Sequence, residues 1–433
     1  MTNMKLLIIL GMLLTVGLAR DYSGYKTIRI TPTNAVDLEI LNDFERDFKH
    51  LVDFWQATRS LDRTWDIMVP SVLVSDIEEF LNANGLSFRV GIEDVQELLD
   101  SQVQKRELAI SSTADFNYDV FHSYQEIRDW VYDFAMEHSD LIEVQDVAFS
   151  YEGRAIALMK IGKPKSDGSP KKGVYYQGGI HAREWLSPAT VISIIRYMVE
   201  DYGVNDDITN LLDTFDYYII PQFNADGYVY TWTQDRLWRK NRHQFPDDVC
   251  DGVDLNRNYP VGWGGNGARG FVCSDVYYGE APFSELEHQD VSQYLYDLKD
   301  NKGVEFVHFI DFHTYSQLLL SPWSYSETVP NPVDYTDHVN VGTAACEALR
   351  KVAGTDYTVG PTAEVLYEAA GSSNDWGYTS NGGLGAKYSY VMELRDTGDY
   401  GFVIPDSFIN VSGRETYEAV KHFGSVIMSE YGS

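Results

Sequence analysis

A histidine and a glutamate three residues apart are the first candidates for chemistry in this chain. His181 and Glu184 lie in the segment GGIHAREWLSP, residues 178–188, directly after a β-rich run. An imidazole and a carboxylate at this spacing can bind one small divalent cation, and the preceding glycines leave the backbone free to turn toward it. The same spacing also occurs on solvated helix faces, so this pattern alone is weak evidence for a metal site.

Catalytic zinc sites usually have three protein ligands and one open position, so a third ligand should come from another element. His313 follows the β-rich run 306–310, although a single histidine after a strand is more often structural. Glu393 adjoins the β-rich run 388–392, where a carboxylate is costly unless it has a task or a partner. It is therefore a candidate general base, and the alternative is an ordinary ion pair with Arg395.

The elements that must position these residues alternate between strands and helices from Phe116 onward. Strands are predicted at residues 174–177, 217–220, 306–310 and 388–392, because β-branched and aromatic residues dominate there. A helix is predicted to open at Ser187-Pro188, and capping-box patterns occur at Ser284 with Glu287 and at Ser412 with Glu415. This order predicts an α/β fold, a sheet covered by helices on both faces.

The N-terminal part predicts a separate small α/β unit over residues 20–106. Strands are expected at 26–31, 65–69 and 87–91, and helices at 38–55, 75–81 and 94–103. The charged dipeptide Lys105-Arg106 follows this unit. Proteases cut chains at exposed basic sites between domains, so a trypsin-like protease is expected to cut near Arg106, with later trimming toward Ala109 or Ser111 possible.

Composition narrows the class of protein and its compartment. The chain has 433 residues and a formal charge of −31, which argues against nucleic acid or an anionic membrane as a partner. Residues 1–19 contain Lys5 and a short apolar run that ends at Ala19, as a cleaved secretory leader does, so the protein is expected to be secreted. No second run approaches the ~20 apolar residues of a membrane span.

Secretion permits disulfides, but three cysteines cannot form a disulfide framework. Cys250 and Cys273 could close one short loop. Cys346 would then remain unpaired in a helical pattern, and a buried thiol is the expected state rather than a reactive one.

Five segments together closely resemble the pancreatic-type metallocarboxypeptidases. They are GGIHAREW at 178–185, RLWRK at 236–240, DLNRN at 254–258, DFHTYSQ at 311–317 and ELRDTG at 393–398. The resemblance covers nearly the whole chain after residue 116, and the leader and first small domain match more loosely. It implies a signal peptide over 1–19, an open-sandwich pro-domain over 20–106, and a catalytic domain over 107–433 built on a central mixed eight-stranded sheet.

The resemblance also implies a role for each residue that matches a family motif. One Zn²⁺ would be bound by His181, Glu184 and His313, Glu393 would be the general base, and Arg239 would stabilise the negative charge of the transition state. Cys250 and Cys273 occupy the positions of a family disulfide. The residues that would bind substrate are Arg183, Asn256, Arg257, Thr314, Tyr315, Tyr367 and Asn374. Asn256 and Arg257 would hold the free α-carboxylate, and Tyr367 would cap the bound C-terminal residue.

The expected function is a secreted zinc carboxypeptidase zymogen that removes single C-terminal residues from peptides, with extracellular digestion as the favoured setting. Asn374 matches the base of the specificity pocket, where A-type enzymes have an apolar residue and B-type enzymes an aspartate. A neutral amide there predicts cleavage of aromatic and aliphatic residues first, with Val391 as an apolar wall and Ser324, Thr362 and Ser373 as polar parts of the pocket.

Three alternative functions remain beside the A-type carboxypeptidase. The first is a B-type enzyme that prefers Lys or Arg. The second is a noncatalytic peptide-binding relative, which would lack a ligand or the base. The third, a zinc endopeptidase, is disfavoured because no HExxH motif is present. Asn410-Val411-Ser412 is in addition a predicted N-glycosylation sequon, expected just before a C-terminal helix.

Overall fold

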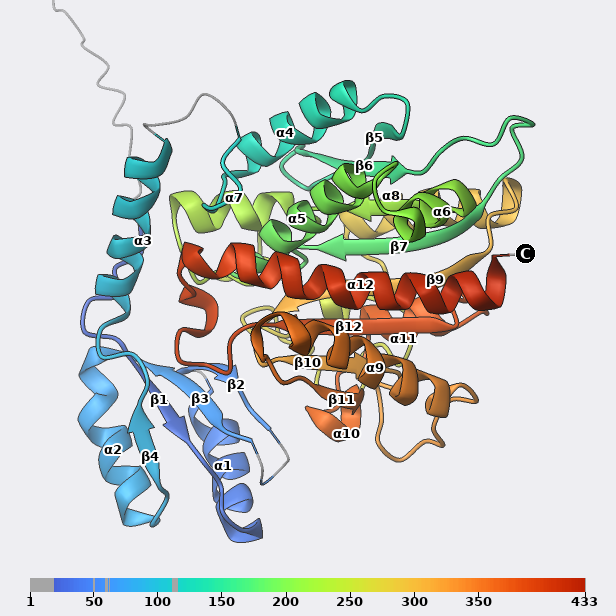
Figure 1. Ribbon diagram of the computed structural model, residues 1–433. Helices are drawn as coiled ribbons and strands as arrows, with labels where there is room; N and C mark the ends of the chain where they lie inside the picture. The colour runs from blue at the N-terminus through green and yellow to red at the C-terminus, as the bar shows by residue number, and fades with distance from the viewer. Residues whose placement is uncertain (1–18, 50, 59–60, 62, 111–115, 433) are drawn as a thin grey trace, which may run out of the picture.

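The computed structural model describes residues 19–432 except 50, 59–60, 62 and 111–115, and it does not describe the side chains of 104–110. The predicted leader therefore lies outside the described residues apart from Ala19. Two sheets organise the described chain, a four-stranded one near the N-terminus and an eight-stranded one after it (Figure 1). The predicted fold class, a helix-covered mixed eight-stranded sheet preceded by a small α/β domain, is confirmed.

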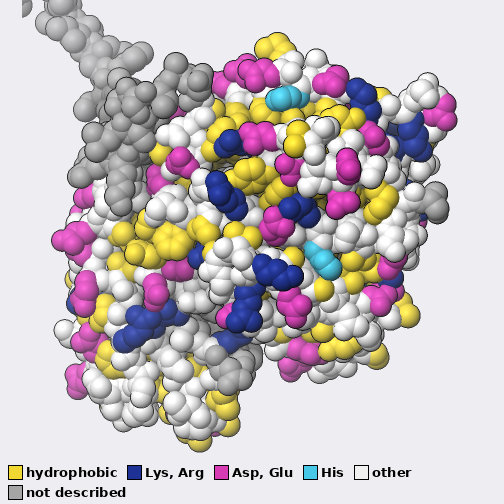
Figure 2. Space-filling model, in the orientation of Figure 1, with side chains coloured by type: hydrophobic (Ala, Val, Ile, Leu, Met, Phe, Trp, Pro, Cys, Tyr) yellow, Lys and Arg dark blue, Asp and Glu magenta, His cyan; other side chains and the backbone are white. Residues whose placement is uncertain are grey.

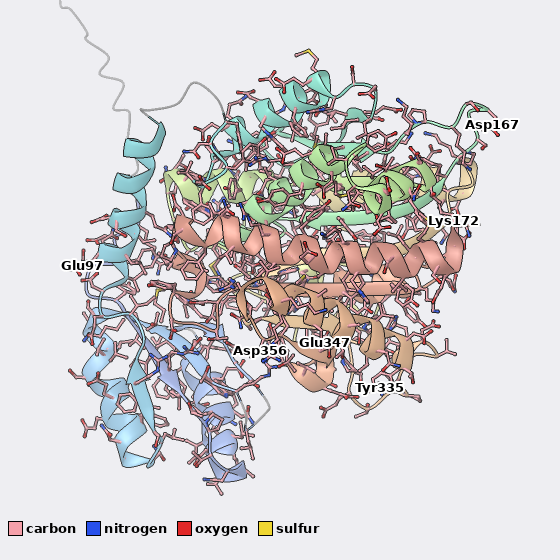
Figure 3. All side chains as sticks on the ribbon, viewed as in Figure 1. Glu97, Asp167, Lys172, Tyr335, Glu347 and Asp356 are labelled. Atoms are coloured by element: carbon pink, nitrogen blue, oxygen red, sulfur yellow. A yellow bond between two sulfur atoms is a disulfide. The ribbon has the colours of Figure 1, made fainter. Side chains whose placement is uncertain are left out.

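The N-terminal unit, which the resemblance predicts to be a pro-domain and which is called so below, packs helices on one small antiparallel sheet. Its sheet has the order β2-β3-β1-β4. The strands are β1 (Lys26–Ile30), β2 (Asp53–Gln56), β3 (Trp65–Val69) and β4 (Phe88–Val90), and the helices are α1 (Ala35–Phe48), α2 (Val74–Ala83) and α3 (Val95–Ile110). Glu97 on α3 points outward into solvent (Figure 3). Lys105-Arg106 falls within the helical backbone of α3.

The large sheet has the strand order β11-β10-β12-β9-β7-β8-β6-β5. Its four central strands, β12, β9, β7 and β8, run parallel to one another, while β10 and β6 pair antiparallel with the flanks of this group. The strands are β5 (Ile142–Phe149), β6 (Ala155–Ile161), β7 (Lys172–Gly178), β8 (Phe215–Ile220), β9 (Phe306–Thr314), β10 (Leu318–Ser321), β11 (Thr358–Pro361) and β12 (Tyr388–Leu394).

Helices cover both faces of this sheet, and each face has its own hydrophobic core (Figure 1). One core includes α4 (Tyr124–Glu137), α5 (Leu186–Asp201), α6 (Asp206–Thr214), α9 (Tyr335–Ala353) and α12 (Ile409–Tyr431). The opposite core includes α8 (Leu286–Tyr296) and α11 (Ser373–Tyr378), while α7 (Ala225–Thr233) contributes to both cores and α10 (Thr362–Val365) follows β11. The central strands are therefore buried on both sides, which explains their continuous apolar runs.

Some local predictions are wrong. The helix predicted over 38–55 ends at Phe48, and Trp55 lies in strand β2 instead. Neither predicted capping box forms, because the Ser284 hydroxyl donates to Glu285 and Ser412 lies inside α12, where it bonds Thr190. In both cases tertiary contacts override a short local pattern.

The glycosylation sequon was predicted to lie just before the C-terminal helix, and this placement is wrong. Asn410 lies in the first turn of α12, within the helix rather than before it. Its side chain is exposed, and its amide donates to Asp119.

The cysteines follow the predicted pairing. Cys250 and Cys273 form a disulfide, and Cys346 is a free, buried thiol whose pKa is raised to about 12 by burial. A thiol with such a pKa stays protonated and unreactive at neutral pH.

The surface carries many charged side chains, as the composition predicts. On the face shown in Figure 2, acidic and basic side chains are interspersed among uncharged ones. Within the described part of the chain, none of the helices combines the length and the apolar character that a membrane crossing requires.

Candidate active site

One group of metal-ligating side chains forms within the described residues, and it contains His181, Glu184 and His313. The Nδ1 atom of His181 lies 2.8 Å from a Glu184 carboxylate oxygen and 3.1 Å from Nδ1 of His313. Nδ1 of His313 is 3.2 Å from the other Glu184 oxygen. All three side chains are buried. Two imidazole nitrogens and one carboxylate oxygen converging in this way form the donor set of a catalytic zinc site, so the residues present fit the metal.

The local chain explains why these side chains converge. His181 and Glu184 lie in the turn between β7 and α5, where Gly179 has a φ of 69° that favours glycine. His313 is the penultimate residue of β9, whereas the sequence predicted that the strand would end before it. Burial alone would raise the pKa of Glu184, but the two imidazoles hold that pKa well below its usual range.

Glu393 lies beside the metal group because two parallel strands are in register. In the pairing of β12 with β9, Glu393 is opposite His313. Burial raises the pKa of Glu393 to about 8, and the neighbouring His313 and Arg239 oppose this rise. The sequence-predicted base and the second histidine are therefore neighbours.

Arg239 is held next to the metal group by a buried carboxylate. Its Nη2 and Nε atoms donate to Asp254 at 2.9 and 3.1 Å, and its Nη1 lies 3.8 Å from a Glu184 oxygen. The other Asp254 oxygen lies 3.0 Å from Nε2 of His181. Burial would raise the pKa of Asp254, but Arg239 and His181 hold it well below its usual value.

Asn256 and Arg257, predicted to bind an α-carboxylate, lie together with Tyr367, predicted to cap the bound residue. Arg257 follows Asn256 in the chain, and its Nη2 is 3.5 Å from the Tyr367 hydroxyl. Arg257 is buried, and its Nε and Nη1 donate to the carbonyl oxygens of Gly267 and Asn256. The Asn256 side-chain oxygen accepts the backbone N–H of Ser373 at 2.8 Å. These bonds hold the guanidinium in place.

Asn374 is fully buried in a network of neutral hydroxyl groups. Its side-chain oxygen accepts from Ser324 at 2.7 Å and from Ser372 at 2.9 Å, and its amide nitrogen donates to Thr362 at 3.1 Å. Ser372 was not among the predicted pocket residues. Ser373, which was, instead donates its hydroxyl to Asp311.

The pro-domain contacts two of the predicted substrate residues, Arg183 and Tyr315. Asp53 of β2 accepts from Arg183 at 2.9 Å, and Asp66 of β3 accepts from the Tyr315 hydroxyl at 2.8 Å. Thr314, next to Tyr315, donates its backbone N–H to Glu184. Trp55 packs on Phe402 with ring centroids 5.2 Å apart, and this contact is part of an apolar cluster that joins the two domains.

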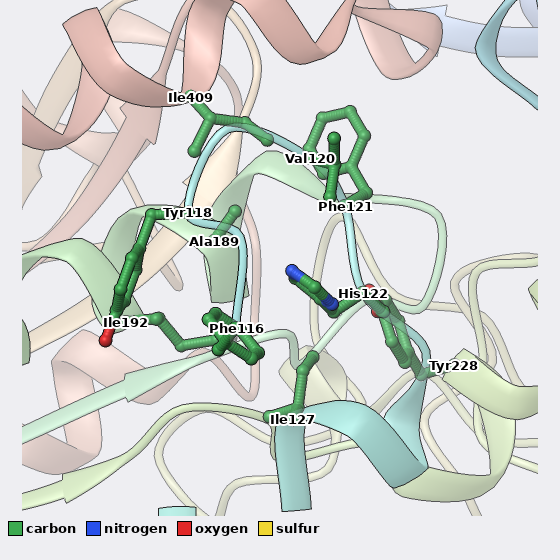
Figure 4. Close-up of a pocket in the computed structure, with 10 residues that line it drawn as sticks. All are labelled: Phe116, Tyr118, Val120, Phe121, His122, Ile127, Ala189, Ile192, Tyr228 and Ile409. Atoms are coloured by element: carbon green, nitrogen blue, oxygen red, sulfur yellow. The ribbon is translucent and has the colours of Figure 1, made fainter. Parts of the chain in front are cut away.

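A separate apolar pocket lies elsewhere in the catalytic unit. It is lined by Phe116, Tyr118, Val120, Phe121, His122, Ile127, Ala189, Ile192, Tyr228 and Ile409 (Figure 4). The His122 ring stacks on Phe116 with centroids 3.9 Å apart. None of the predicted site residues lines this pocket, so it is not the candidate active site.

Sequence reasoning did not assign a role to two buried carboxylates behind the histidines, Asp254 and Asp311. Asp254 lies two residues before Asn256 and Asp311 two before His313, but nothing in a linear pattern indicates that either carboxylate faces an imidazole. A signal was available for Asp311, because residues two apart on a strand share a face and Asp311 lies two before His313.

Comparisons with known proteins agree with this geometry. The family model described as zinc carboxypeptidase matches residues 127–419, and the one described as carboxypeptidase activation peptide matches residues 28–102. Carboxypeptidase A1 from Bos taurus is 36% identical over 423 residues, covering 96% of this chain and 97% of its own length. Carboxypeptidase B from Bos taurus is 35% identical over 414 residues and covers 94% of each chain.

Solved structures of related proteins are also similar to this chain. The structure of thrombin activatable fibrinolysis inhibitor matches with a TM-score of 0.82 at 32% identity, covering 94% of this chain and 100% of that one. Carboxypeptidase A from Helicoverpa armigera matches with a TM-score of 0.84 at 27% identity, covering 95% and 99%. The predicted zinc group of two histidines and one glutamate is confirmed by the family match and by the geometry together.

Proposed function

Because this chain belongs to the zinc carboxypeptidase family, we propose that it removes single C-terminal residues from peptides and proteins, with neutral aromatic and aliphatic residues first. Its activity as a zinc carboxypeptidase with an activation peptide follows from the family. A-type and B-type relatives are almost equally similar to it, so the choice of substrate must rest on this chain's own residues.

Glu393 and Arg239 carry the chemistry in this proposal. Zinc bound to His181, Glu184 and His313 would supply a Lewis acid that polarises the scissile carbonyl and lowers the pKa of water. Glu393 takes the proton of the attacking water and gives it to the leaving amine. Arg239 stabilises the negative charge that develops on the carbonyl oxygen, and its fixed pairing with Asp254 avoids reorganisation during the reaction. The observation that supports these roles best is the strand register that sets Glu393 opposite His313.

Restriction to chain ends follows from the proposed carboxylate clamp. Arg257 would bind the free α-carboxylate through its guanidinium, assisted by Asn256, and Tyr367 would cover the bound residue. Support comes from the bonds that hold the Arg257 guanidinium in place. An internal peptide segment has no carboxylate at this point, so an endopeptidase activity is not expected.

The preference for neutral residues rests on Asn374. A B-type pocket needs a carboxylate to pair with Lys or Arg, whereas the Asn374 amide is neutral and its oxygen already accepts two hydroxyl hydrogen bonds. Asp375 is the nearest carboxyl in sequence, but its oxygens accept the backbone N–H groups of Ser324 and Tyr325. Val391 is buried and pairs with Leu320, whose carbonyl oxygen accepts from Asn374, which supports an apolar wall here. Digestion outside the cell is the setting we propose for such a broad preference.

Latency is proposed to depend on the pro-domain. Arg183 and Tyr315 are expected to bind the peptide backbone of the substrate, with Thr314 beside them, and in the uncut chain their polar groups are taken by Asp53 and Asp66. A trypsin-like protease would cut near Arg106, at the end of the proposed pro-domain over 20–106. The predicted domain boundaries, the cut and the removal of residues 1–19 on secretion stay predictions, and N-terminal sequencing of the protein from culture medium before and after trypsin tests all three.

The experiment that tests the proposed specificity uses trypsin-treated protein. It measures kcat/KM for matched blocked dipeptides ending in Phe, Leu, Gln, Arg and Glu, with and without a zinc chelator. We expect Phe and Leu to be cleaved fastest, Gln to be tolerated, and the chelator to abolish all cleavage. Faster cleavage of Arg than of Phe would make the enzyme B-type, and no cleavage of any substrate would favour a noncatalytic relative.

A further inference from the structure

A buried carboxylate faces the outer nitrogen of the second histidine ligand. Asp311 and His313 lie two residues apart on β9, so both side chains project from the same face of the strand. The Oδ2 atom of Asp311 is 3.0 Å from Nε2 of His313. Both side chains are shielded from solvent, with 0% and 1% of their surface exposed. The contact is therefore a short, desolvated hydrogen bond.

The direction of this hydrogen bond follows from the other side of the ring. Nδ1 of His313 faces Nδ1 of His181 and a Glu184 oxygen, so it is the nitrogen whose lone pair can bind the metal. A neutral imidazole that uses Nδ1 as a ligand carries its proton on Nε2. The Asn256 amide nitrogen also lies 3.4 Å from Nε2, but a protonated nitrogen has no lone pair to accept from it. Nε2 therefore donates its proton to Asp311.

The two histidine ligands differ in the charge of the carboxylate behind them. Asp254, behind His181, also accepts two hydrogen bonds from Arg239, which neutralises much of its charge. Asp311 has one other partner, the neutral hydroxyl of Ser373 at 2.6 Å on the same Oδ2 atom. Within the described residues its Oδ1 atom has no hydrogen-bond partner, and no Lys or Arg lies within ion-pair distance of the carboxylate. The negative charge of Asp311 therefore acts mainly on the imidazole of His313.

We propose that Asp311 is a positioning residue of the zinc centre, which fixes the ring orientation and tautomer of His313 and raises the basicity of the nitrogen that binds the metal. Loss of a carboxylate behind a ligating histidine typically lowers metal affinity by roughly 10- to 100-fold. The inference rests on the metal group and is independent of the proposed substrate preference. Asp311 also connects the metal group to the specificity pocket, because it accepts a hydrogen bond from Ser373, the residue before Asn374.

The test measures zinc affinity of the full chain by competition with a chelator, so that it does not depend on catalysis. Asp311→Asn changes little besides charge, since the amide oxygen can keep both bonds of Oδ2 while the amide nitrogen takes the place of Oδ1. We expect its zinc dissociation constant to rise roughly 10- to 100-fold. Ser373→Ala is the matched control, because it removes the other hydrogen bond to the same oxygen without changing the charge, and its dissociation constant should rise less than about threefold. A normal dissociation constant for Asp311→Asn, or an equal rise in both variants, would overturn the proposal.

A second measurement needs no variant and keeps the proposal open to refutation if Asp311→Asn does not fold. In the zinc-loaded wild-type protein with ¹⁵N-labelled histidine, the resonance of His313 Nε2 should be that of a protonated nitrogen, with its proton shifted downfield by the carboxylate hydrogen bond. An unprotonated Nε2, or a proton without this shift, would show that Asp311 does not accept from His313.

Discussion

The replacement of Asn374 by aspartate gives the sharpest test of how this enzyme selects its substrates. The two side chains have nearly the same shape, and three hydroxyl groups, those of Ser324, Ser372 and Thr362, already surround the amide at 2.7 to 3.1 Å. Ser324 and Ser372 already donate to the side-chain oxygen, and Thr362 can rotate to donate to the second. Asn374→Asp should therefore place a carboxylate at the base of the pocket without moving its neighbours.

The expected gain follows from the strength of a charged hydrogen bond in a desolvated site. Such a bond contributes about 1.5–3 kcal/mol, which corresponds to roughly 10- to 150-fold in kcat/KM. We expect the ratio of kcat/KM for Arg over Phe substrates to rise by this factor. Part of the change should come from slower cleavage of Phe, because an apolar ring would leave the new carboxylate buried without an opposite charge.

The assay compares trypsin-treated wild-type and variant enzymes on matched blocked dipeptides ending in Arg and Phe. Ser324→Ala is the control, since it removes a hydroxyl from the same network without adding charge, and its ratio should stay within about threefold of the wild type. If Asn374→Asp also leaves the ratio within threefold, Asn374 does not contact the substrate side chain, and the predicted preference loses its basis.

Four further predictions concern the metal, the base, activation and modification. His313→Ala should lower zinc occupancy, measured by metal analysis of purified protein, and abolish hydrolysis; full activity without metal would defeat the assignment. Glu393→Gln should keep its zinc but lose about 10²- to 10⁴-fold in kcat, because proton transfer alone is removed; near-normal turnover would eliminate Glu393 as the base. Arg106→Gln should slow activation by trypsin, followed by activity and gel electrophoresis; if the uncut protein already hydrolyses large peptides at the full rate, the pro-domain does not cause latency. Asn410→Gln should lower the intact mass of the secreted protein by one glycan, and an unglycosylated wild-type protein would contradict the sequon prediction.

The central strands and the metal ligands could be predicted because their signals are local or strongly patterned. Strand β3 of the small sheet was predicted with its exact bounds at 65–69. The four central strands of the large sheet, β7, β8, β9 and β12, were predicted within a few residues, because buried strands are continuous apolar runs. The outer strands β5, β6, β10 and β11 were not predicted. The ligand pair His181 and Glu184 lies within a single turn, so its spacing is visible in the sequence.

Features that depend on distant segments could not be predicted. Trp55 was assigned to a helix by its spacing, yet its ring packs against Phe402 in another domain. Ser412 resembled a helix cap, but its hydroxyl is buried against Thr190 of α5. A local pattern cannot indicate such contacts, because its partner lies more than 200 residues away in each case.

The arrangement of the sheet explains why residues so far apart in the sequence meet at one point. The strands β12, β9 and β7 are adjacent and parallel, so their carboxyl ends lie at one edge of the sheet. Glu393 and His313 come from the ends of β12 and β9, and His181 follows the end of β7. In α/β sheets this edge is where ligands bind. Sequence patterns could identify each strand and the residue at its end, but only the strand order β12-β9-β7 makes those ends neighbours, and that order is not sequential along the chain. The same argument applies to Asp311, since it is the strand conformation of β9 up to Thr314 that turns its carboxylate toward His313. A strand that ended at Ile310, as the sequence suggested, would have left both side chains in a loop with no defined common face.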